Sequence, residues 1–118
     1  MLTDEQVTRF NRDGFLNGGK ILDDAQVDVL RDELSRVIEG GENLDRKPVR
    51  MSNLSGNEAA PVWQIVNIWE ASDAYADLVH HHKIAEDMAQ LTGAKSLRIW
   101  HDQIQFKPAE TGGVNWWH

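Results

Sequence analysis

The clearest pattern of apolar and polar positions in this chain is a helical one near its beginning. Four apolar residues recur at intervals of three, four and three positions, which places them on one face of a helix, and polar residues fill the other face; the four are Val27, Leu30, Leu34 and Val37. Asp23 is suited to cap this helix, which we expect over residues 24–39. A shorter helix is expected over residues 3–13, because Thr3 and Gln6 have the spacing of a capping box.

Later in the chain the pattern changes to one typical of strands. Residues 62–69 are β-branched and aromatic and predict a strand, and residues 96–107 predict a longer one that Pro108 ends. Residues 72–92, between the two strands, predict two short helices. Residues 42–61 are polar and rich in turn-forming types, so we expect a long loop there, either a lid over a site or a surface excursion. Helices that precede strands favour an α+β fold.

Side chains alternate along the longer predicted strand. One face carries four polar residues, which are His101, Gln103, Gln105 and Lys107. The other face carries apolar residues with Asp102 as the exception: Trp100, Ile104 and Phe106. Two arrangements fit this alternation. Helices can cover the apolar side of a sheet whose polar side lines a cavity, or the strand can be half solvated, with its polar face in water.

Composition places the chain among ordinary globular domains and argues against several functions. Its 118 residues, 41% hydrophobic and 26% charged, suffice for one domain. A net charge of −7 without a basic cluster argues against a nucleic-acid partner. The chain has no cysteine, no apolar run of membrane-spanning length and no signal-peptide core. We therefore expect a cytoplasmic protein without a membrane partner.

Few residues stand in patterns that carry chemistry. The chain contains neither the G-x-S-x-G elbow of hydrolases nor a glycine-rich phosphate-binding loop. The histidines at 80–82 cannot converge on one ion, since neighbours on a helix point about 100° apart, so we expect a helix cap or plain surface there. His118 follows a Gly-Gly loop and two tryptophans. It is either structurally idle or the first member of an H-x-D/E pair, which would begin a 2-His-1-carboxylate Fe(II) site.

Several segments of the chain, taken in order, are similar to one known family. They are LTDEQVTRFNRDGFL, ILDDAQVDVLRDEL, IWEASDAYADLV, IAEDMAQLTGAKSLRIWHDQIQFKP and GGVNWWH. Together they resemble the phytanoyl-CoA dioxygenase family of Fe(II)- and 2-oxoglutarate-dependent oxygenases, and the resemblance covers essentially all 118 residues. It implies N-terminal helices packed on the start of a double-stranded β-helix, a jelly roll of the cupin type. Residues 1–118 would be the N-terminal part of one oxygenase domain.

The resemblance also implies roles for particular residues. His118 would be an iron ligand, and Gln103 matches a family position that contacts 2-oxoglutarate. Lys107 shares the strand face of Gln103, and Asn67 lies in a region where family members place another cosubstrate contact. Two aromatic residues are candidates for the wall of the site or are ordinary core residues: Trp116 and Trp117. The implied reaction hydroxylates a small organic substrate and releases succinate and CO₂.

The same resemblance implies that the family's remaining site residues follow beyond residue 118. These are the acidic iron ligand, the distal histidine and the basic residue that binds the far carboxylate of 2-oxoglutarate. We expect residues 1–118 alone to be inactive and poorly folded or homo-oligomeric, because unpaired strand edges invite association. The alternative from another class of function is a non-catalytic binding or scaffold module of the same fold without iron.

Overall fold

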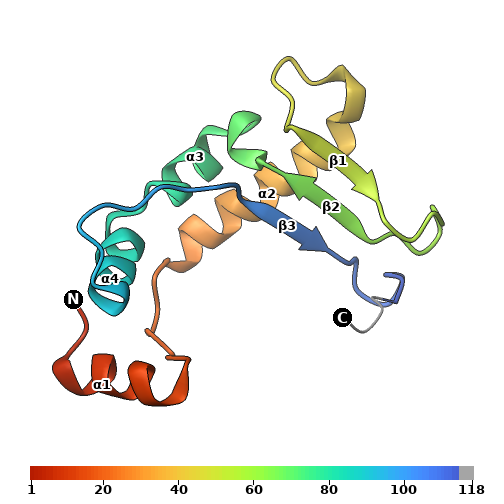
Figure 1. The fold of residues 1–118 in the computed structure, drawn as a ribbon. Helices are drawn as coiled ribbons and strands as arrows, with labels where there is room; N and C mark the ends of the chain where they lie inside the picture. The colour runs from red at the N-terminus through yellow and green to blue at the C-terminus, as the bar shows by residue number, and fades with distance from the viewer. Residues whose placement is uncertain (115–118) are drawn as a thin grey trace.

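The computed structural model describes residues 1–114 and has an α+β fold in which helices and strands occupy separate parts of the molecule (Figure 1). A three-stranded antiparallel sheet lies at one end, with α2 behind it, and α1 and α4 lie at the other end. The elements in chain order are α1 (Asp4–Asp13), α2 (Asp24–Gly40), the 3-10 turn η1 (Gly41–Asn43), β1 (Arg50–Asn53), β2 (Trp63–Val66), the 3-10 turn η2 (Ile68–Glu70), α3 (Asp73–Val79), α4 (His82–Thr92) and β3 (Gln103–Phe106).

Local capping explains where the first helices begin. The Thr3 hydroxyl accepts the backbone N–H of Gln6 at 3.2 Å, and the Gln6 side chain accepts the backbone N–H of Thr3 at 2.8 Å. Asp23 and Gln26 repeat this capping box at the start of α2. Gly14 ends α1 with φ +79°, a conformation that L side chains rarely adopt. The predicted starts of both helices are therefore confirmed.

The hydrophobic core lies between the sheet and the helices that back it. Its buried residues come from α2, β2, η2, the residue after η2 and α3: Val37, Ile65, Ile68, Ala71 and Tyr75. Leu30 and Leu34 of the predicted α2 stripe pack against this core, which confirms that part of the prediction, whereas Val27 is half-buried and does not contact the core. Tyr75 also donates its hydroxyl to the carbonyl of Leu30 at 3.0 Å, so the buried phenol has a partner and joins α3 to α2.

The strand predictions were wrong in their extents. The expected loop over 42–61 contains η1 and β1, whose four residues are too few to stand out from a polar stretch. The strand expected over 62–69 ends at Val66, because Asn67 has φ +55° and turns the chain into η2. The strand expected over 96–107 is limited to β3, since no described segment pairs with the residues before it.

The predicted pair of helices over 72–92 is present, with a break at residues 80 and 81. Ser72 caps α3, and Gly93 ends α4 with φ +68°, as the sequence predicted. At the far end of the molecule, α1 itself has no buried residue. Its attachment there is the main chain of Leu2, which exchanges two hydrogen bonds with the side-chain amide of Gln90, at 2.9 and 2.8 Å. In the described part of the chain no helix is long and apolar enough to cross a membrane.

Candidate functional site

The two faces of the sheet differ in chemical character. Residues paired across antiparallel strands lie on the same face. The row Met51, Ile65, Ile104 faces the helices, because all three belong to the core or pack against it. The opposite face carries two rows of mostly polar residues, which we call the polar face: Arg50, Val66 and Gln103 in one row, and Ser52, Gln64 and Gln105 in the next.

On the polar face, a cationic side chain and an amide side chain lie on either side of an apolar residue. Arg50 and Gln103 are exposed and flank the half-buried Val66. With strands about 4.8 Å apart, their Cα atoms are separated by about 10 Å. Arg50 Nη2 donates to Gln64 Oε1 at 2.7 Å, which holds the guanidinium over the sheet. This arrangement suits a small carboxylate-bearing ligand, since guanidinium and amide N–H groups both donate to carboxylate oxygens.

Arg50 was missed as a site residue by the sequence reasoning, which placed it in a loop. The alternation that indicates a strand was present there, but it was short. Met51 is the apolar member of the four-residue strand RMSN, and its neighbours on either side are polar. An alternation of this length indicates a strand only when its partner is known, and the partner β2 begins ten residues after β1 ends.

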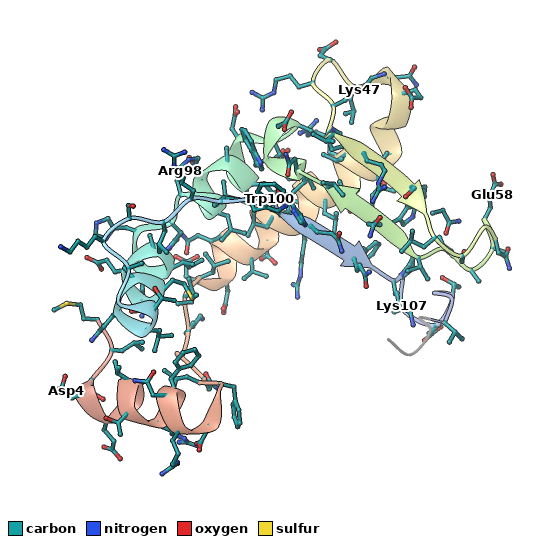
Figure 2. All side chains as sticks on the ribbon, viewed as in Figure 1. Asp4, Lys47, Glu58, Arg98, Trp100 and Lys107 are labelled. Carbon is teal, nitrogen blue, oxygen red and sulfur yellow. The ribbon has the colours of Figure 1, made fainter. Side chains whose placement is uncertain are left out.

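Two of the predicted cosubstrate residues lie at opposite ends of β3. Gln103 opens the strand opposite Val66, and Lys107 follows one residue after the strand ends, with the same alternation and an exposed side chain. Figure 2 shows Lys107 at the end of β3 that is remote from Trp100. The two Cα atoms are four strand residues apart, about 13 Å. The structure therefore places Gln103 on the polar face and leaves Lys107 exposed beyond the other end of the strand.

Asn67 is not brought together with Gln103. Its side-chain amide donates to Glu70 Oε1 at 2.9 Å and accepts the backbone N–H of Asp102 at 3.3 Å. Its own backbone N–H donates to the carbonyl of Asp102 at 3.0 Å. By alternation from Val66 it belongs to the opposite side of the sheet. Asn67 therefore joins the end of β2 to the start of β3, and partial burial at this junction raises the pKa of Asp102.

Three predicted site residues lie outside the described residues: Trp116, Trp117 and His118. The chain that leads to them is packed against the β1–β2 connection. The backbone N–H of Gly113 donates to the carbonyl of Pro61 at 3.4 Å. A Cβ at Gly113 would lie 2.7 Å from the carbonyl oxygen of Ala60, and one at Gly112 would lie 2.8 Å from that of Pro108. Both positions therefore require glycine, which explains the Gly-Gly pair in the sequence.

Residues 1–114 contain no group of three or more histidine, aspartate or glutamate side chains placed to hold a metal ion. The histidine triplet divides between two helices. His80 occupies the C-cap of α3, with its Nδ1 2.8 Å from the carbonyl oxygen of Ala76, and this cap agrees with the sequence prediction. His81 is the N-cap residue of α4, and His82 lies in its first turn, 3.3 Å from Glu86.

Comparisons of the chain with protein-family models, with curated proteins and with solved structures found no match. The resemblance to the dioxygenase family is therefore carried by the sequence segments alone. The geometry of the described residues adds three features that bear on function. These are a sheet backed by helices on one face, a polar opposite face that carries Arg50 and Gln103, and a glycine-dependent connection that leads toward residue 118.

Proposed function

We propose that this chain contributes the cosubstrate side of an Fe(II)- and 2-oxoglutarate-dependent dioxygenase that hydroxylates a small organic substrate and releases succinate and CO₂. The observation that carries the proposal is the position of Gln103, the residue that matches the family's 2-oxoglutarate contact. It is exposed on the polar face of a helix-backed sheet, with the guanidinium of Arg50 in the same row. Within the proposal, the sheet and its helices begin a double-stranded β-helix.

The roles of the chain's own residues follow from their chemistry. The Gln103 amide donates a hydrogen bond to a carboxylate of 2-oxoglutarate, and the Arg50 guanidinium lies across from it, beyond the side chain of Val66, where it adds a charge-assisted contact to that of the basic residue expected beyond residue 118. Lys107 contributes positive charge from the far end of the strand. Charge-assisted hydrogen bonds of this kind contribute about 1.5–3 kcal/mol each, so each contact is worth roughly ten- to a hundredfold in affinity.

The described residues do not by themselves form an iron site, and His118 is the proposed ligand from this chain. Gly113, five residues earlier, lies against the side chain of Val62, which is four residues along β2 from the row of Gln103. Five residues of extended chain span at most about 17 Å, whereas four strand residues span about 13 Å. The chain between Gly113 and His118 is therefore long enough to reach Gln103. Iron bound with 2-oxoglutarate would supply the oxidising chemistry.

The proposal is tested by thermal unfolding, without oxygen, of the protein that includes the residues expected beyond residue 118, with Fe(II), 2-oxoglutarate or both. We expect the two together to raise the unfolding temperature by more than the sum of their separate effects. Arg50→Gln and Gln103→Leu should each raise, at least tenfold, the 2-oxoglutarate concentration needed for the same increase in unfolding temperature. His118→Ala should abolish the dependence of that temperature on iron. Arg46→Gln is the matched control, because Arg46 is bound to Asp73 outside the strands and should leave binding unchanged.

An absence of any ligand effect, or equal effects of Arg50→Gln and Arg46→Gln, would contradict the proposal. The alternative, a binding or scaffold module without iron, is favoured by one observation. A cation and an amide on an open face can bind a carboxylate without metal, and residues 1–114 hold no three-ligand group. That module would bind 2-oxoglutarate and succinate equally, without iron. Succinate production by the iron-loaded protein that includes the residues expected beyond residue 118 would exclude it.

A further inference from the structure

Residues 97–101 run into β3 without any main-chain hydrogen bond to the rest of residues 1–114. The cause lies in the neighbouring strand. Asn67, with φ +55°, turns the chain away from the sheet directly after β2. Without this turn, the residue that follows Asn67 would have paired with His101. The stretch contains neither helix nor turn, and it leads directly into an edge strand of the sheet. It therefore presents unsatisfied N–H and C=O groups, as an unprotected strand edge does.

The side chains of this stretch are apolar and unusually exposed. Trp100 is 92% exposed, Ile99 51% and Leu97 46%, and Figure 2 shows Arg98 and Trp100 along the chain that leads into β3. Together with α4 and η2 the stretch borders a groove of about 720 Å³, whose apolar lining includes Trp69, Ile84, Met88, Leu97, Ile99 and Trp100. Large exposed apolar patches mark interaction surfaces, and unpaired backbone in the same stretch points to a strand as the occupant.

We propose that residues 97–101 pair in antiparallel fashion with the same residues of a second copy of this chain, centred on Ile99. The stretch reads LRIWH, and this register is self-complementary. Ile99 meets Ile99, Leu97 meets His101, and Arg98 of each copy meets Trp100 of the other. The last pair puts a guanidinium against an indole, which stabilises a cross-strand contact. The interface is isologous, so it closes as a dimer.

The charges near the stretch disfavour one neighbouring register. Arg98 never faces itself, because its opposite residue is an aromatic ring. A shift of one residue toward the C-terminus would place Arg98 opposite His101 and bring two basic groups together. The nearest carboxylate in sequence, Asp102, has its backbone held by Asn67, which fixes where the free stretch ends. A second copy therefore satisfies both the open backbone and the side-chain pattern.

Site-directed cross-linking tests the register directly, since the chain has no cysteine of its own. Ile99→Cys places two thiols opposite each other at the symmetry axis, and mild oxidation should give a disulfide-linked dimer. In Leu97→Cys each thiol faces His101 of the other copy. The two thiols then belong to residues about 13 Å apart, beyond the roughly 7 Å that a disulfide can bridge between Cα atoms. We expect no cross-link from Leu97→Cys.

Sedimentation equilibrium provides the second measurement. The wild-type chain should pass from 13.4 kDa to twice that mass as its concentration rises. Ile99→Lys should raise the dissociation constant at least tenfold, whereas Val49→Lys, at a 63% exposed position outside the stretch, should leave it unchanged. A chain that stays monomeric at every concentration would overturn the proposal and leave the groove to a strand of another protein or to an apolar ligand. Equal cross-linking of both cysteine variants would overturn the register.

Discussion

Glu33 joins α2 to the start of α3, and its removal should make stability depend less on pH. Arg36 donates to both carboxylate oxygens of Glu33 from Nε and Nη2, each at 2.8 Å, and the Ser72 hydroxyl donates at 2.5 Å. Arg36 Nη2 also donates to the carbonyl of Ala71 at 2.7 Å. The hydrogen bonds from Arg36 and then Ser72 lower the pKa of Glu33 from 4.5 to about 2.

The size of the effect follows from this pKa. At about 1.4 kcal/mol per pH unit, a change from 4.5 to about 2 corresponds to at most about 3.5 kcal/mol of stabilisation. The Glu33 side chain is 26% exposed and that of Arg36 46%, so water screens the pair and we take about 1.5 kcal/mol. Because the folded-state pKa is lowered, this stabilisation is complete above pH 4.5 and is lost as the pH falls through 2.

We expect Glu33→Gln to lower the free energy of unfolding by about 1.5 kcal/mol at pH 7, which is about 4–8 °C in the unfolding temperature. The assay is thermal unfolding followed by circular dichroism between pH 2 and pH 7. Asp28→Asn is the control, because Asp28 also pairs with an arginine three residues on but is 70% exposed. It should change stability by less than about 0.5 kcal/mol. A difference between wild type and Glu33→Gln that stays constant down to pH 2, or equals that of Asp28→Asn, would show that the contacts of Glu33 with Arg36 and Ser72 do not stabilise the fold.

Two further predictions concern the sheet. Ile65→Ala should destabilise the fold by about 2–5 kcal/mol, because Ile65 is fully buried between β1, β3 and the helices. Chemical denaturation should then show a lower midpoint, and an unchanged midpoint would mean that the core lies elsewhere. Asn67→Ala should lower the free energy of unfolding by about 1–3 kcal/mol, because it removes the contact with Asp102 and strains a left-handed backbone. Asn67→Gly should lower it less, since glycine adopts this conformation without strain. Equal losses of stability for the two variants would show that backbone conformation is unimportant there.

The helices could be predicted from the sequence because their determinants are local. The capping boxes at Thr3 and Asp23 and the apolar stripe of α2 lie within a few residues of the structure that they specify. Strand extents depend on pairing between distant segments, so the same reasoning failed there. A left-handed Asn67 ends one strand and thereby removes the partner of residues 97–101, and nothing in the neighbouring sequence announces it.

The candidate site shows the same division. Alternation along the last strand predicted a polar face that carries Gln103, and the strand pairing confirms it, whereas Lys107 follows the last paired residue. Arg50 could not be found in this way, because it joins Gln103 only through two strand pairings that the sequence does not specify. Asn67, proposed from the resemblance as a cosubstrate contact, lies at the junction of β2 and β3, where its amide already bonds to Glu70 and Asp102.

The attachment of α1 gives the molecule two levels of local stability. This helix buries none of its own residues, and Leu2 with the Gln90 amide ties it to α4. Opening that contact exposes the buried side chain of Leu2, whereas opening the sheet exposes the whole core around Ile65. Amide protons of α1 should therefore exchange with solvent through small, frequent openings, while those of β2 exchange only when the whole domain unfolds. The N-terminal helix can thus detach and return without disturbing the polar face.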